Sequence, residues 1–271
     1  MELSISNIAW PAEHTGEMLE MVKRLGCDAI EVAPSRIWEE PSQATREDAK
    51  GFLNRVKKAG LSIVALHSLL YTRKDLGLFR DKDTELATAA YIEKLVYLAS
   101  FLGARYLVFG SPENRRKGDL SAEEALERAA DFFSKPANLA EQLGVCIVIE
   151  PLSEQETDFI TDSSQGLRLV TMVNSRGFGL HLDAKSIFTE AMPYKRVFTE
   201  MAPLAKHFHI NDPGLIEVGS VAKYHEAFGA ALRETGYSGC VSIEMRTLPD
   251  FRKVIERSIG VAKRCYIERP K

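Results

Sequence analysis

Hydrophobic and polar positions follow two alternating patterns along the chain. Short apolar runs of strand type recur, and longer segments with the period of an amphipathic helix separate them. That order predicts a parallel sheet, and eight such units are enough to close a (β/α)8 TIM barrel. The predicted strands are residues 3–9, 28–33, 61–67, 105–110, 145–150, 178–183, 206–211 and 240–245.

The clearest helical segments lie between the first five strand-like runs, at residues 14–26, 46–60, 83–103 and 121–144. Each of them ends in a glycine, where a left-handed residue commonly closes a helix. Pro136 interrupts the last of these segments, which predicts a kink or a helix in two pieces. The longest irregular stretches follow predicted strands, on the side where such barrels place their active sites. They are residues 34–45, 68–82 and 111–120.

Length and composition bound the class of protein. A chain of 271 residues with 45% hydrophobic content is expected to form one TIM-barrel domain over residues 1–271. The formal net charge of −3 provides no basic field for nucleic acid or for an anionic membrane surface. The first residues lack the pattern of a signal peptide and no apolar run is long enough to span a bilayer, so we expect a cytoplasmic protein.

Four polar residues stand at the downstream ends of successive apolar runs. They are Glu150, Asp183, His209 and Glu244, and the intervals between them are about 30 residues, the length of one strand-plus-helix unit. Each therefore tops a different strand, and the four should converge on one face of the barrel. Three carboxylates cannot stay ionised together in a cleft without a compensating cation. These hard ligands suit Mn²⁺, Mg²⁺ or Co²⁺ better than structural Zn²⁺.

Strand alternation places a second side chain one layer below each of these residues. His181 shares a face with Asp183, and His207 shares one with His209. We interpret both lower histidines as hydrogen-bonded core residues.

Several segments together resemble the xylose isomerase-like TIM barrel superfamily, specifically its sugar phosphate isomerase/epimerase branch, which includes ketose 3-epimerases and inosose dehydratases. The resemblance covers essentially the whole chain. The segments that carry it, in chain order, are IEVAP with Glu31, ALHSLLY with His67, FGSPENR, VIEPL, HLDAKS, HFHINDPG and GYSGCVSIEMR.

The resemblance implies that Glu150, Asp183, His209 and Glu244 coordinate one divalent ion, usually Mn²⁺ in the sugar epimerases, with Mg²⁺, Co²⁺ or Zn²⁺ as alternatives. Glu150 and Glu244 then double as acid and base. The implied activity is isomerisation or epimerisation of a small ketose, polyol or sugar phosphate through an enediolate.

Three other functions stay open at this point. A metal-dependent dehydratase of a keto-inositol or a dehydroshikimate-like substrate would use a similar site. A non-catalytic sugar-binding protein could share the scaffold. An endonuclease IV-like nuclease is suggested by HIND, which is similar to its HLND, but the further histidines of its zinc cluster are missing and the net charge is acidic.

Candidate substrate contacts surround the proposed metal. Superfamily members often carry a histidine where this chain has Ser186, and Lys185 is a candidate hydroxyl or oxyanion contact instead, with a solvated loop lysine as the alternative. His67 is a candidate hydroxyl contact, although core packing competes. Glu31 is expected to bind a hydroxyl or to tie down a loop.

Two arginines and one tryptophan complete the candidate list. Arg115, in the PENRRKGD loop, and Arg246, two residues past Glu244, are candidate anion contacts that would favour a phosphorylated or carboxylated substrate. A solvated loop is the alternative for Arg115. Trp38 is expected either to stack on a sugar ring or to cap the barrel core. A homodimer is compatible with such a barrel, and no segment demands one.

Overall fold

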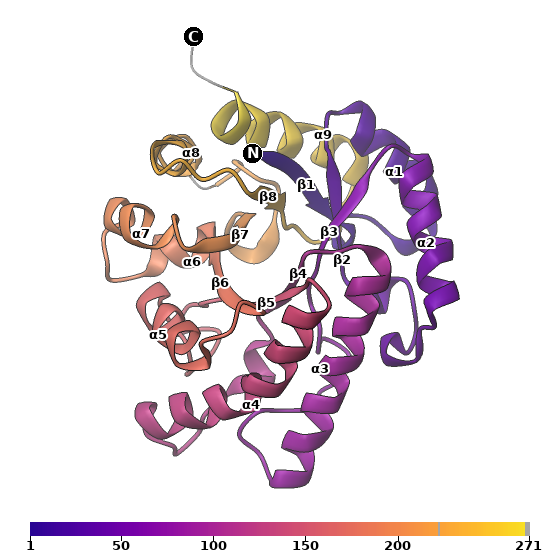
Figure 1. The fold of residues 1–271 in the computed structure, drawn as a ribbon. Coiled ribbons are helices and arrows are strands. Elements are labelled where there is room, and N and C mark those ends of the chain that lie inside the picture. Colours follow the sequence, from indigo (N-terminus) through magenta and orange to yellow (C-terminus); the bar gives the residue numbers. More distant parts are fainter. Residues whose placement is uncertain (222, 269–271) are drawn as a thin grey trace.

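The chain folds into a closed barrel of parallel strands with helices around it (Figure 1). This computed structural model describes residues 1–221 and 223–268. The strands neighbour one another in chain order, and β8 pairs with β1 to close the barrel. The predicted TIM barrel is thereby confirmed. The strands are β1 (Glu2–Ser6), β2 (Ala29–Val32), β3 (Ser62–Leu66), β4 (Tyr106–Phe109), β5 (Cys146–Ile149), β6 (Phe178–Asp183), β7 (Ala205–Ile210) and β8 (Cys240–Ile243).

Helices cover the outside of the barrel (Figure 1). Within the described part of the chain the α-helices are α1 (Thr15–Arg24), α2 (Arg46–Lys58), α3 (Lys82–Leu102), α4 (Ala122–Gln142), α5 (Ser163–Val173), α6 (Ala184–Thr189), α7 (Tyr194–Met201), α8 (His225–Glu234) and α9 (Phe251–Ala262). Because two helices, α6 and α7, lie between β6 and β7, this connection departs from the simple repeat.

Local sequence signals explain several helix ends. The predicted closing glycines all have left-handed backbone angles, and Gly103 at the end of α3 is one example, with φ of 69°. At the start of α2, Thr45 and Asp48 form a capping box. The prediction of a helix in two pieces around Pro136 was wrong, because α4 runs as one element. Pro136 lies on the buried face of α4, where tertiary packing supports the helix despite the missing N–H.

The hydrophobic core has two layers. A large cluster fills the space between the strands and the surrounding helices. A smaller cluster lies inside the barrel and consists mostly of small side chains: Ala29, Val64, Ala65, Val108, Cys146, Val148 and Cys240. The rest of the barrel interior is polar, because Glu31, His181 and His207 are fully buried there.

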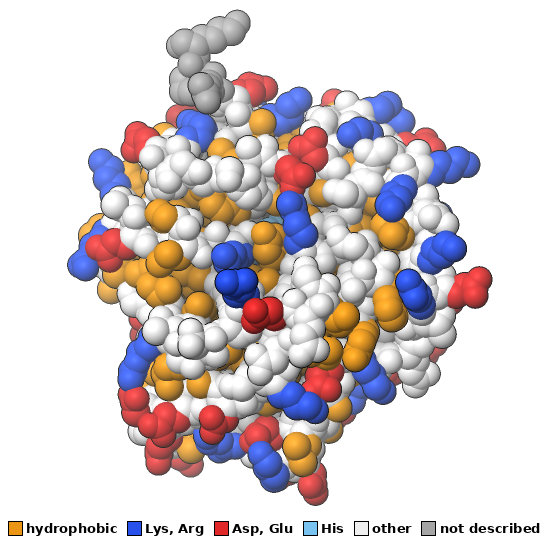
Figure 2. Space-filling model, viewed as in Figure 1, with side chains coloured by type: hydrophobic (Ala, Val, Ile, Leu, Met, Phe, Trp, Pro, Cys, Tyr) orange, Lys and Arg blue, Asp and Glu red, His pale blue; other side chains and the backbone are white. Residues whose placement is uncertain are grey.

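The surface carries charges of both signs. Figure 2 shows Lys and Arg side chains interspersed with Asp and Glu over the visible face, without one dominant basic patch. Across residues 1–221 and 223–268, none of the helices combines the length and apolar character that crossing a bilayer would require.

Candidate metal centre and active site

Four side chains converge where four neighbouring strands end. Glu150 directly follows β5 and Asp183 ends β6. His209 is the second-last residue of β7, and Glu244 directly follows β8. Nδ1 of His209 is their common centre, with Oε1 of Glu150 at 3.3 Å, Oδ2 of Asp183 at 3.8 Å and Oε2 of Glu244 at 3.5 Å. Three carboxylates and one imidazole therefore face one point.

Hydrogen bonds hold two of these carboxylates in place. Oδ1 of Asp183 accepts the backbone N–H of Ser186 at 2.9 Å, so Asp183 also caps α6. The side-chain amide of Asn211 donates to Oδ2 of Asp183 at 2.6 Å and to Oε2 of Glu244 at 3.1 Å. A single amide group thus sets the separation of two candidate ligands that stand on different strands.

The position of Glu150 depends on the absence of a side chain at Gly110. A Cβ atom added at Gly110 would collide with Oε2 of Glu150. Gly110 directly follows β4, the strand that pairs with β5. The neighbouring strand therefore leaves the space that Glu150 occupies.

The electrostatics of the site favour a cation among the carboxylates. Burial would lower the pKa of His209, but the Glu31 and Glu244 carboxylates outweigh burial and raise this pKa well above its ordinary value. Burial raises the pKa of Glu150. For Glu244 the effect of burial is outweighed by His209 and His67, and the pKa is lowered. The carboxylates therefore favour a positive charge at this point, and a bound divalent ion would supply one.

The chemistry of the donors fits a divalent metal. Nδ1 of His209 has no hydrogen-bond partner in the described part of the chain. Glu150, His181, Asp183 and His209 each offer one donor atom, and these atoms all lie within 4.8 Å of one another. This buried His/Glu/Asp group can therefore hold a divalent ion. Glu244, the fourth ligand expected from the sequence, lies outside this group, and His181 competes with it for the fourth position.

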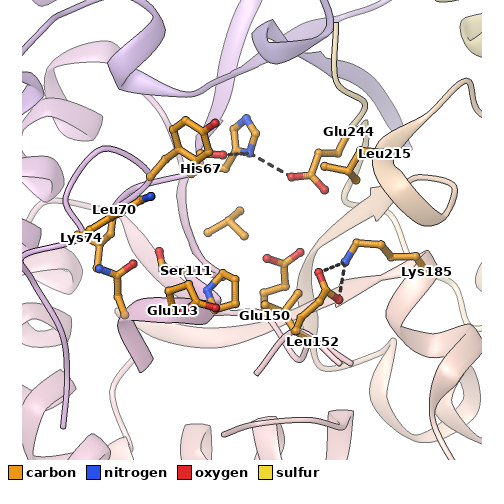
Figure 3. Close-up of a pocket in the computed structure, with 17 residues that line it drawn as sticks. His67, Leu70, Lys74, Ser111, Glu113, Glu150, Leu152, Lys185, Leu215 and Glu244 are labelled. Carbon is orange, nitrogen blue, oxygen red and sulfur yellow. Dashed lines mark hydrogen bonds and ion pairs between the residues drawn. The ribbon is translucent and has the colours of Figure 1, made fainter. Parts of the chain in front are cut away.

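A cavity of about 330 Å³ opens above the carboxylates (Figure 3). Its volume lies near the lower end of the range for small-molecule sites, roughly 300–1,000 Å³. Charged residues, the two glutamates among them, share the lining with apolar residues such as Leu70 and Leu215. The lining residues are His67, Ser68, Leu70, Tyr71, Lys74, Val108, Gly110, Ser111, Pro112, Glu113, Asn114, Glu150, Leu152, Glu156, Lys185, Leu215 and Glu244.

Two of the candidate substrate contacts line this cavity. Nζ of Lys185 lies 3.7 Å from Oδ1 of Asp183 and donates to both carboxylate oxygens of Glu156, at 3.2 and 3.3 Å. Burial would lower the pKa of Lys185, but Asp183 and the surrounding glutamates raise it, so the side chain stays charged. Nδ1 of His67 lies 3.4 Å from Oε1 of Glu244 (Figure 3).

Arg115 does not reach the cavity, contrary to the expectation of an anion contact. Its guanidinium is fully buried and donates to backbone carbonyl oxygens, at 2.7 Å to Glu150 and at 3.3 Å to Ile160. Burial lowers the pKa of Arg115 to about 10. The short turn Pro112–Arg115 directs the side chain inward, and Arg115 therefore braces the loop after β5.

Arg246 and Trp38 also lie away from the cavity lining. The side chain of Arg246 is exposed, and its backbone N–H donates to the carbonyl of Leu215. Trp38 packs against Phe52 with ring centroids 5.8 Å apart, which corresponds to the expected alternative of a core cap. Neither residue is positioned to contact a ligand at the metal centre.

Glu31 lies inside the barrel, beneath the metal centre, and not in the cavity. Both of its carboxylate oxygens approach Nε2 of His209, at 3.0 and 3.1 Å. The expected hydroxyl or loop contact is therefore replaced by a contact to a candidate metal ligand. His181 and His207 are buried in the core as expected, but their ring nitrogens have no hydrogen-bond partner among the described residues.

Sequence reasoning missed Asn211, Gly110 and Glu156. Asn211 stands two residues after His209 in HIND, and strand alternation was a usable signal for it. Gly110 ends the predicted strand 105–110, and the sequence has no feature there that marks a close approach. Glu156 lies in an irregular loop, where no periodicity indicates the direction of a side chain.

Comparisons with known proteins give the family of the chain. A family model described as xylose isomerase-like TIM barrel matches residues 19–265. The chain is 24% identical over 243 residues to the D-psicose 3-epimerase of Agrobacterium fabrum strain C58. The matched region covers 87% of this chain and 80% of that relative.

Solved structures show the same fold at low identity. A D-psicose 3-epimerase crystallised in the presence of D-fructose superposes with a TM-score of 0.82 at 18% identity, covering 98% of this chain and 99% of that chain. The 3-keto-D-glucoside 4-epimerase YcjR from E. coli superposes with a TM-score of 0.78 at 17% identity. The match covers 96% of this chain and 99% of that chain. The IOLI protein with a bound zinc atom superposes with a TM-score of 0.72 at 19% identity. The match covers 98% of this chain and 96% of that chain.

Proposed function

Because the chain belongs to the xylose isomerase-like TIM barrel family, we propose that it is a divalent-metal-dependent epimerase or isomerase of a small ketose, polyol or sugar phosphate. The observation that carries the proposal is a pair of glutamates, Glu150 and Glu244. Their carboxylates line one cavity from the ends of different strands (Figure 3). Both approach Nδ1 of His209, at 3.3 Å from Glu150 and 3.5 Å from Glu244. The ketose epimerases among the relatives support the same class of reaction.

The two glutamates would divide the proton transfer between them. A bound divalent ion, held by Glu150, Asp183, His209 and Glu244, supplies Lewis acidity that polarises a carbonyl and acidifies the adjacent C–H. One glutamate carboxylate removes that proton. The other returns a proton either from the opposite face of the same carbon, which gives an epimer, or at the neighbouring carbon, which gives an isomer.

Two further side chains would orient the substrate. The ammonium of Lys185 stays charged beside Asp183 and is suited to an oxygen on which negative charge develops. His67 lines the cavity beside Glu244 and is suited to a hydroxyl group. We propose Mn²⁺ as the ion, because three oxygen donors and one nitrogen form a hard ligand set.

A dehydratase is the second candidate, because proton abstraction followed by loss of a β-hydroxyl needs the same machinery. An acidic substrate would call for an arginine in the cavity, and neither Arg115 nor Arg246 lines it. Lys74 and Lys185 are the lysines that do. Among the described residues, the lining contains no arginine for a bidentate contact to a carboxylate, which favours a neutral keto-inositol over dehydroshikimate as the substrate of such a lyase.

Proton NMR in D₂O tests the proposal. Mn²⁺-loaded and EDTA-stripped protein would be incubated with ketoses, ketose phosphates, keto-inositols and dehydroshikimate, and the metal removed before acquisition. We expect metal-dependent loss of one C–H signal together with a new sugar isomer. New olefinic signals would establish the dehydratase instead. A fully loaded protein that exchanges no proton in any substrate would contradict both reactions.

A further inference from the structure

We propose that Glu31 is a positioning residue for the metal centre: it fixes the ring of His209 so that Nδ1 faces the ion. The inference rests on the metal site of the proposed function and adds a residue that touches neither ion nor substrate. Glu31 lies on β2 and reaches across the barrel interior to β7. Its side chain is fully buried and does not line the cavity.

The contacts of Glu31 leave one role for each nitrogen of His209. Nε2 lies 3.1 Å from Oε1 and 3.0 Å from Oε2 of Glu31, within hydrogen-bond distance. When Nε2–H donates to this carboxylate, the lone pair is on Nδ1. Nδ1 is the atom that faces Glu150, Asp183 and Glu244. A carboxylate behind a metal-bound histidine selects the tautomer in this way and increases the basicity of the ligand.

A hydrogen bond from Ser242 and the nearby ring of His207 make it possible to bury the charge of Glu31. The hydroxyl of Ser242 donates to Oε2 at 2.7 Å, and Nε2 of His207 lies 3.4 Å from Oε1. A buried carboxylate is strongly destabilising unless such partners surround it. Because Ser242 stands on β8 and His207 on β7, the anchor is tied to two of the strands that carry metal ligands.

A second arrangement of the same residues makes a different prediction. Glu31, His207 and His209 could bind an ion of their own in the barrel interior. This would require His209 to bridge two ions and give up the proton on Nε2, so that two ions would bind per chain. The hydrogen-bond geometry favours the anchoring role, and the stoichiometry of binding separates the two.

The test is a calorimetric titration of metal-free protein with Mn²⁺, on the wild type and on Glu31→Gln. The amide keeps the size of the side chain and removes its charge. We expect one ion per chain in the wild type and a roughly 10- to 100-fold weaker affinity in Glu31→Gln, the range measured for such supporting residues. Glu190→Gln is the matched control, because Glu190 is a partly buried carboxylate that accepts hydrogen bonds from Ser163 away from the site. Its Mn²⁺ affinity should equal that of the wild type.

The visible absorption of the Co²⁺-loaded protein adds a readout that a structural role alone would not change. Its bands should shift in Glu31→Gln and stay unchanged in Glu190→Gln. If Glu31→Gln does not fold, Ser242→Ala removes a donor to Glu31 and should weaken Mn²⁺ binding by a few-fold. An unchanged Mn²⁺ affinity in Glu31→Gln would overturn the inference. If Glu31→Gln does not fold, an unchanged Mn²⁺ affinity in Ser242→Ala would overturn it. Binding of two ions per wild-type chain would overturn it as well. If metal binding depends on Glu31 but the protein turns over no substrate, the role of Glu31 is upheld and only the proposed function is contradicted.

Discussion

The two halves of the barrel contribute different things to the same site. Strands β5 to β8 end in the four candidate ligands, one from each strand. Strands β2 to β4 bring residues that stand behind or beside the ligands: Glu31 on β2, His67 after β3 and Gly110 after β4. The second half therefore carries the proposed chemistry, and the first half, together with Asn211 after β7, helps to determine where those atoms lie. Substitutions in the second half should remove groups that take part in the reaction, whereas substitutions in the first half should displace them.

The largest expected effect belongs to the second half. Glu150→Gln and Glu244→Gln each remove a proposed proton-transfer group and should lower kcat by about 10²–10⁴-fold, the range for general acid–base groups. The fold should be unchanged, because each amide matches the carboxylate in size. Steady-state kinetics on the substrate found by NMR, with circular dichroism as the fold check, measure this. Substantial residual activity in both variants would contradict the two-glutamate assignment.

In the first half, a single added methyl group should be enough to displace a proposed catalytic carboxylate. Gly110→Ala places a Cβ against Oε2 of Glu150, so this carboxylate must move. A displacement of about 1 Å can cost about 100-fold in rate, and we expect a loss of kcat of that order. Gly16→Ala is the matched control, because a Cβ there meets no atom within 4 Å. Equal kcat values for the two variants would show that the position of Glu150 does not depend on Gly110.

Lys185 tests whether the cavity needs a cation beside the carboxylates. Lys185→Met removes a charged hydrogen-bond donor, and the loss of about 1.5–3 kcal/mol typical of such bonds corresponds to roughly a 10- to 100-fold lower kcat/KM. Arg246→Met is the comparison, since its side chain is exposed outside the lining, and its kcat/KM should stay within about twofold of the wild type. A larger loss in Arg246→Met than in Lys185→Met would reverse this ranking.

The pH dependence of metal binding is the most general test, because it needs no substitution. The pKa of His209 is raised by the Glu31 and Glu244 carboxylates against the effect of burial, and burial raises the pKa of Glu150. Below these raised values both groups hold protons that an incoming ion must displace. Mn²⁺ affinity should therefore rise with pH until both groups are deprotonated, by up to tenfold per pH unit for each proton released. Calorimetry in buffers of different ionisation enthalpy counts those protons. Affinity that does not change with pH would contradict the assignment.

Much of this division was predictable from the sequence. An apolar run that ends in a single polar residue marks both a strand and its functional end, and this pattern identified Glu150 and Asp183 correctly as strand-end residues. The regular spacing of such runs predicted the barrel. Both signals are local, because they depend only on residues within one strand-plus-helix unit.

The supporting roles of Glu31, Arg115 and Gly110 were not predictable, because they depend on contacts between segments that are distant in the sequence. Glu31 follows a register shift between β2 and β3, and this shift determines how deep in the barrel its carboxylate lies. Arg115 stands in an irregular loop without periodicity, so its inward direction is not encoded locally. The crowding of Gly110 by Glu150 appears only once β4 and β5 are paired.

A crystal structure of the protein grown with Mn²⁺, with anomalous diffraction measured at the manganese edge, tests the central claim most directly. We predict one anomalous peak within bonding distance of Glu150, Asp183, Glu244 and Nδ1 of His209, with Nε2 of His209 still on Glu31. A peak bonded to His181 in place of Glu244 would revise the ligand set. No peak among these residues, or a peak confined to the barrel interior beside His207, would contradict the account.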